Sequence, residues 1–126
     1  MGRVETREEL FKRVFEFALT REKCAEFEFE DERKIELSYL KNAYEGITEK
    51  FDELTQEIAS HTKGYSIDRV FKVDLALLLV AVYEIKYENE IPPAVSINEA
   101  LNLAKKYSTD KSSSFINGVL ANFVKK

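Results

Sequence analysis

The sequence "VDLALLLVAVYEI", residues 73–85, contains the longest uninterrupted apolar run of the chain. A helix at a protein surface usually carries its apolar residues on one face only, at spacings of three and four. Here apolar residues would lie on nearly every side of the helix, so other helices are expected to surround it. The flanking residues extend the predicted helix to about 68–87, with Asp68 at its start. Pro92 and Pro93 follow, and they force a break.

The rest of the chain contains amphipathic segments that can surround this central helix. Apolar residues recur at helical spacing in each of them, and no convincing strand is present. The expected fold is therefore all-α, with six or seven helices packed around residues 73–85 in a single domain that spans residues 1–126. The surrounding helices are predicted at 6–20, 32–45, from Thr48 to the "SHTKGY" segment that contains Gly64, from Ser96 to about Tyr107, and 113–124.

Two helix starts are predicted from capping boxes, in which a Ser or Thr is followed three residues later by Glu. Thr6 with Glu9 marks the first, and Ser96 with Glu99 marks the second. The segment "EFEFEDERK", residues 26–34, alternates like a strand. It is short and has no second strand to pair with, so we interpret it as a loop.

Length and composition indicate a folded, soluble protein. The 126 residues are 44% hydrophobic and 33% charged, which suits one domain with a real core. The single cysteine, Cys24, excludes an internal disulfide framework and fits a reducing cytoplasm. The apolar run from Leu75 to Tyr83 is about half of what would cross a bilayer. The amino terminus is too charged for a secretory signal. A cytoplasmic location and no membrane association are expected.

Charge is unevenly distributed along the chain. Residues 1–23 carry a net charge of +1, residues 24–62 carry −7 and residues 63–126 carry +2, within a total of −4. A surface for nucleic acid would therefore combine the two ends of the chain. The basic excess is small, so non-specific phosphate binding should be weak at physiological salt. Ordinary solvated helix faces would give the same pattern.

Residues for catalysis or metal binding are scarce. His61 is the only histidine, Cys24 has no partner cysteine, and the four glycines form no phosphate-binding loop. We therefore expect no enzymatic activity, no metal and no cofactor.

The segment "SSSFINGVLANF", residues 112–123, gives two conflicting signals. Asn117-Gly118 is typical of a tight turn, whereas the apolar residues around it have helical spacing. We predict an unbroken helix. Gly118 would let its backbone approach another helix or an RNA where a side chain would collide.

Two stretches resemble the NusB family of bacterial transcription antitermination factors. They are "IDRVFKVDLALLLVAVYEI", residues 67–85, and "EIPPAVSINEALNLAKKYSTDKSSSFINGVL", residues 90–120. Their elements have the order and spacing of the family pattern over about 65–120. The amino-terminal "RVETREELFKRVF", residues 3–15, matches the family's arginine-rich start more loosely.

The resemblance implies a fold and a set of partners. The family fold is an all-α bundle of seven helices in two small subdomains. Family members bind the boxA sequence of single-stranded ribosomal or phage RNA together with NusE, a small-subunit ribosomal protein. The complex, with other Nus factors, modifies RNA polymerase so that it resists termination. Some relatives also self-associate, so a homodimer is possible.

The resemblance also implies a role for individual residues. Arg3 and Arg7 would hold phosphates or stack on bases, or they are exposed charges near a helix start. Asp74 would face the ribosomal-protein partner, or it is an exposed carboxylate on the central helix. The other residues implied at the RNA surface are Phe15 and Phe115, each with a core position as the alternative, together with Lys111, Asn117 and Gly118.

Two other functions remain open from the sequence. The chain resembles the NusB-like domain that precedes some ribosomal RNA cytosine methyltransferases, and this resemblance implies an accessory role in ribosomal RNA processing or methylation. Alternatively, it is a protein-interaction module whose RNA face has decayed, which fits the thin arginine cluster that Arg3 and Arg7 form at the amino terminus.

Overall fold

The structure, a computed structural model, describes residues 3–23, 36–62 and 70–124. Within these ranges the secondary structure is helical and no strand is present, which confirms the predicted all-α class and approximately the predicted number of helices. The helices are α1 (Arg3–Thr20), α2 (Leu37–Glu49), α3 (Phe51–Ala59), α4 (Lys72–Tyr87), α5 (Pro93–Tyr107) and α6 (Asp110–Ala121).

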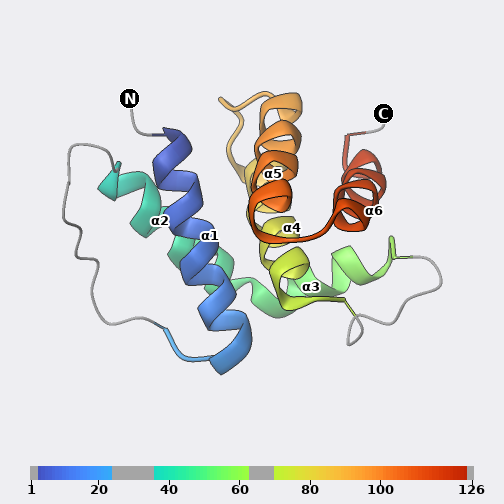
Figure 1. Cartoon of the computed structure of the whole chain (residues 1–126). Coiled ribbons are helices and arrows are strands. Elements are labelled where there is room, and N and C mark those ends of the chain that lie inside the picture. Colours follow the sequence, from blue (N-terminus) through green and yellow to red (C-terminus); the bar gives the residue numbers. More distant parts are fainter. Residues whose placement is uncertain (1–2, 24–35, 63–69, 125–126) are drawn as a thin grey trace.

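Helix α4 is the centre of the bundle. It contacts each of the other five helices, with α1 and α2 on one side and α5 and α6 on the other (Figure 1). Every residue from Asp74 to Glu84 is buried. As expected, α4 is apolar on nearly every side because other helices pack against it from nearly every side.

Neither predicted capping box caps a helix. Helix α1 begins at Arg3 and α5 at Pro93, so Thr6 and Ser96 lie inside their helices. Both side chains are buried and bond to distant residues instead. The Thr6 hydroxyl accepts a hydrogen bond from the Glu36 backbone N–H at 2.7 Å, and the Ser96 hydroxyl donates to Glu84 at 2.8 Å. The capping-box prediction was wrong because these hydroxyls bond to residues of other segments and do not cap the first turn of a helix.

Other helix boundaries also differ from the sequence prediction. The Thr48 hydroxyl donates back to the Tyr44 carbonyl inside α2, and Lys50 occupies the N-cap of α3. Helix α6 begins three residues earlier than expected, since the Thr109 side chain accepts from the Ser112 backbone N–H. The predictions for Cys24, residues 26–34, Gly64 and Asp68 lie outside the described residues.

Pro92 and Pro93 start α5, whereas α4 already ends at Tyr87. Pro92 is the N-cap of α5 and Pro93 is its first residue, where a missing N–H costs nothing. In the part of the chain that the structure describes, no helix combines the length and apolar character needed to cross a membrane.

Candidate nucleic-acid interface

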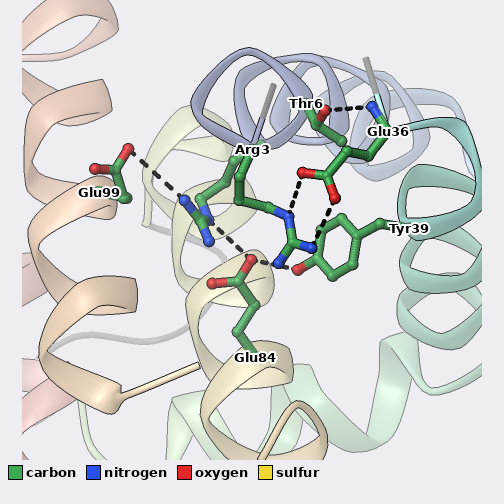
Figure 2. A network of polar contacts seen from close by, with 7 residues as sticks. Arg3, Thr6, Glu36, Tyr39, Glu84 and Glu99 are labelled. Atoms are coloured by element: carbon green, nitrogen blue, oxygen red, sulfur yellow. Dashed lines mark hydrogen bonds and ion pairs between the residues drawn. The ribbon is translucent and has the colours of Figure 1, made fainter. Parts of the chain in front are cut away.

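Arg3, the first arginine implied at the RNA surface, is held by two neighbours. Its Nε and Nη2 atoms donate to the two carboxylate oxygens of Glu36, each at 2.9 Å (Figure 2). Its guanidinium carbon lies 4.1 Å from the centre of the Tyr39 ring. The hydrogen bond to Glu36 raises the pKa of Arg3, and the same bond lowers the pKa of Glu36. The Arg3 side chain is still 37% exposed, so solvent reaches part of it.

Arg7 is buried in the interior of the bundle, with 4% of its side chain exposed. Its Nε atom donates to Glu84 at 2.8 Å, and its Nη1 atom lies 3.7 Å from Glu99 (Figure 2). Its role at the RNA surface stays a prediction. Direct contact with a phosphate would require Arg7 to leave a buried carboxylate.

Glu84 is the centre of this polar network. It is fully buried and accepts hydrogen bonds from Arg7, the Tyr39 hydroxyl and the Ser96 hydroxyl. Burial raises the pKa of Tyr39, and the neighbouring Glu84 charge raises it further. Because the four residues come from α1, α2, α4 and α5, the network joins these helices at one point.

A groove of about 580 Å³ lies between the start of α4 and the start of α6. This α4–α6 groove brings together Lys111 and Phe115, which were both implied at the RNA surface. Lys111 is exposed, whereas Phe115 is half-buried and packs against the core. The walls of the groove include Phe71, Asp74, Thr109, Lys111, Ser112 and Phe115.

Asp74, implied at the partner interface, lies at this groove but is only 4% exposed. One of its carboxylate oxygens accepts from the Ser108 hydroxyl and the other from the Ser112 hydroxyl, each at 2.8 Å. The alternative of an exposed carboxylate was therefore wrong. Asp74 fastens α4 to the start of α6, and its role toward a partner stays a prediction.

Phe15 lines a second depression, of about 450 Å³, between α1 and the start of α4. The walls of this α1–α4 groove include Phe15, Leu19, Phe71, Lys72, Tyr107 and Thr109. Phe15 is half-buried, and its ring centre lies 6.3 Å from that of Phe11. Tyr107 also packs on Phe11, at 5.2 Å, and it remains 36% exposed.

Asn117 and Gly118 lie on the exposed side of α6, which continues through them without a break. A Cβ atom built on Gly118 would have no neighbour within 4 Å. The explanation that Gly118 allows another helix to approach is therefore wrong, while approach by an RNA stays a prediction. Among the described glycines, Gly46 is the crowded one, because a Cβ there would lie 2.6 Å from the Tyr83 ring.

Gly118→Ala is expected to stabilise the fold by up to about 1 kcal/mol, because Ala has the higher helix propensity and the new methyl meets open space. Urea unfolding followed by circular dichroism would measure the change. Gly46→Ala is the matched control. It should gain less or lose stability, because its methyl collides with Tyr83. A destabilised Gly118→Ala protein would contradict the open surroundings of this glycine.

The sequence did not identify Phe71 or Lys72 as site residues. Phe71 is 60% exposed, lines both grooves and precedes the first residue of α4. The sequence analysis placed the start of this helix at Asp68, so Phe71 was expected inside the helix and nothing in the sequence indicated its exposure.

In the described ranges, no group of three potential metal ligands among His, Cys, Asp and Glu is present. His61 packs edge-on against Phe123 with ring centres 5.0 Å apart.

The NusB family profile matches residues 3–125. The chain belongs to the NusB family. A NusB-family protein of Clostridium botulinum, named "Transcription antitermination protein NusB", is 43% identical over 106 residues, which cover 84% of this chain and 73% of that protein. The protein of the same name from Clostridium kluyveri is 37% identical and covers 99% of this chain, with 96% of its own length matched.

The NusB fold is also found in a solved structure. The structure of NusB from T. maritima matches with a TM-score of 0.85 and 27% sequence identity, covering 100% of this chain and 92% of that one. The arrangement of helices around α4 is therefore that of a NusB-family bundle. The sequence resemblance, which rested mainly on residues 65–120, is confirmed and extends over nearly the whole chain.

Proposed function

We propose that this chain is a transcription antitermination factor. It binds boxA-type single-stranded RNA of ribosomal RNA operons together with a NusE-type small-subunit ribosomal protein, and with other Nus factors it modifies RNA polymerase. The observation that carries the proposal is the family match over residues 3–125, with relatives that bear the antitermination name. The role involves binding rather than catalysis, needs no cofactor and belongs in the cytoplasm, where bacterial transcription takes place.

The α4–α6 groove is the proposed RNA surface. It places the Lys111 ammonium and the Phe115 ring in one hollow, as a ligand made of phosphates and bases requires. No described carboxylate lies within 4.0 Å of the Lys111 ammonium. Asn117 and Gly118 lie on the exposed side of the same helix and can extend this surface.

The two amino-terminal arginines are proposed to contribute to RNA binding in different ways. Arg3 is open enough to touch a phosphate without leaving Glu36, and we keep it as a direct contact. Arg7 is buried against Glu84, so we propose that it acts by fixing the position of α1. The burial of Arg7 also favours a second candidate, a protein-interaction module whose RNA face has decayed.

Lys111→Glu should weaken binding to boxA-type RNA and make the binding less dependent on salt. Loss of one phosphate contact on a single strand reduces the slope of log affinity against log salt by about 0.7. Filter binding at several salt concentrations would measure the slope. Lys41→Glu on α2 is the matched control, because it changes the net charge equally at an exposed position of another helix. Equal slopes for the wild-type and Lys111→Glu proteins would remove Lys111 from the site.

The ribosomal partner is proposed to bind near the start of α4. Asp74 is too buried for a direct ion pair unless its serine hydrogen bonds open. We therefore propose that Asp74 contributes to that interface by holding the beginning of α6 in place.

A further inference from the structure

Phe71 is the most exposed of the large apolar side chains in the described part of the chain, at 60%. It lies at the N-cap of α4 and no ring packs on it among the described residues. Because more than half of its side chain faces solvent, the Phe71 ring is available to a ligand.

Phe71 lies where the two grooves meet. It forms part of the wall of both the α4–α6 groove and the α1–α4 groove, and so does Thr109. The α1–α4 groove in turn shares Phe15 and Leu19 with a further hollow along α1. The three hollows therefore adjoin, and Phe71 marks the passage from the α6 side to the α1 side.

A cation accompanies each aromatic ring along this path. Lys111 shares the α4–α6 groove with Phe115, and Lys72 follows Phe71 directly. Lys12 and Arg13 line the hollow that contains Phe15. The Lys106 ammonium lies 5.4 Å from the centre of the Tyr107 ring and is paired with Glu8 at 2.7 Å. Rings that alternate with cations are typical of surfaces that bind single-stranded nucleic acid, because bases stack on the rings and phosphates meet the cations.

Two carboxylates of the path are already engaged within the protein. Glu9 pairs with Arg13 at 3.2 Å, and buried Asp74 accepts from two serine hydroxyls. Lys72, by contrast, is exposed and has no described carboxylate within 4.0 Å. The open charges near Phe71 and Lys111 are therefore the cations Lys72 and Lys111 and the exposed carboxylate of Asp110, a net charge of +1 that favours a phosphate backbone.

We propose that Phe71 is a base-stacking residue that guides single-stranded RNA from the α4–α6 groove into the α1–α4 groove, with Lys72 contacting the adjacent phosphate. The inference rests on the proposed function and adds residues that lie outside the Lys111 and Phe115 pair. It also predicts that the bound strand continues past Phe115 toward α1.

The test measures binding of boxA-type RNA and of a scrambled RNA in the absence of any protein partner. Phe71→Ala and Phe71→Leu should both weaken binding of boxA-type RNA by about 5- to 150-fold, the equivalent of one lost stacked base. Phe71→Tyr should bind like the wild type because it keeps the ring. Tyr87→Ala is the control, because Tyr87 is 39% exposed at the other end of α4 and its removal should not change the RNA affinity.

The Leu variant separates RNA stacking from protein docking, because it keeps apolar surface but has no ring. If Phe71→Leu binds RNA like the wild type, stacking at Phe71 is refuted. Stacking at Phe71 is also refuted if Phe71→Ala keeps its RNA affinity and loses binding to the ribosomal protein. In both cases, specific RNA binding by the wild type would still support the proposed function. A wild type that binds neither RNA, with or without the ribosomal protein, would refute the function and this inference together. Ultraviolet cross-linking of bound RNA to the peptide that contains Phe71 would support the inference directly.

Discussion

Glu84→Met is expected to lower the free energy of unfolding by about 3–5 kcal/mol, the usual cost of removing one partner from a buried ion pair. The Arg7 guanidinium would stay buried with its main carboxylate gone. The hydroxyls of Tyr39 and Ser96 would also lose their acceptor. Urea unfolding followed by circular dichroism measures the change. In a domain of typical stability this loss is a large fraction of the total.

Two further variants test whether this cost comes from the buried position of Glu84 or would follow from the loss of any carboxylate. Glu36→Ala removes the more exposed carboxylate that holds Arg3, and it should cost about 1 kcal/mol or less. Adding Arg7→Met to Glu84→Met should recover part of the lost stability, because the uncompensated charge disappears as well. If Glu84→Met and Glu36→Ala cost the same, the network around Glu84 is not a structural centre.

Asp74→Ala is expected to cost about 2–4 kcal/mol, because two hydrogen bonds to a buried carboxylate are lost. The Ser112 hydroxyl, itself buried, would keep only its contacts with Ser108 and Thr109. The same change should loosen the start of α6 against α4 and therefore weaken RNA binding in the α4–α6 groove. Thermal and urea unfolding measure the first effect, and filter binding measures the second.

Asp110→Ala is the matched control for Asp74. Asp110 lines the same groove and carries the same charge, but it is exposed in the first turn of α6. Its removal should change stability by less than about 1 kcal/mol. An Asp74→Ala protein as stable as Asp110→Ala would show that the serine hydrogen bonds do not fasten α6.

The central helix could be predicted from the sequence because its signal is local and strong. Residues 73–85 are apolar on nearly every side, and only a helix surrounded by others accommodates this pattern. The two prolines predicted a break after this helix for an equally local reason, although α5 begins at Pro93 and not at Ser96 as expected. These features depend on neighbouring residues alone, so the all-α class followed from them.

The ends of helices, and whether a charged residue is buried or exposed, could not be predicted in the same way. Thr6 and Ser96 match capping boxes, yet their hydroxyls bond to Glu36 and Glu84 in other helices. Such contacts exist only after the helices have packed. Arg7 looked like a surface cation for the same reason, since its partner Glu84 is 77 residues away in the chain.

The candidate site was found in part. Lys111 and Phe115 are close in the sequence, so the motif that contains them implied a shared surface, and they line one groove. Phe71 was missed because exposure at the end of a helix depends on how that end packs. Phe71 lies between two grooves because residues of α1, of α4 and of the segment that leads into α6 line these grooves.

The central claim is that this chain recognises boxA-type RNA in cooperation with a ribosomal protein. Its direct test is the affinity of the wild-type chain for boxA-type and scrambled RNA, each measured with and without the NusE-type partner. We predict a preference for boxA-type RNA and an increase in affinity of about 5- to 150-fold when the partner is present, a coupling of about 1–3 kcal/mol. Equal affinity for the two RNAs under both conditions would contradict the claim.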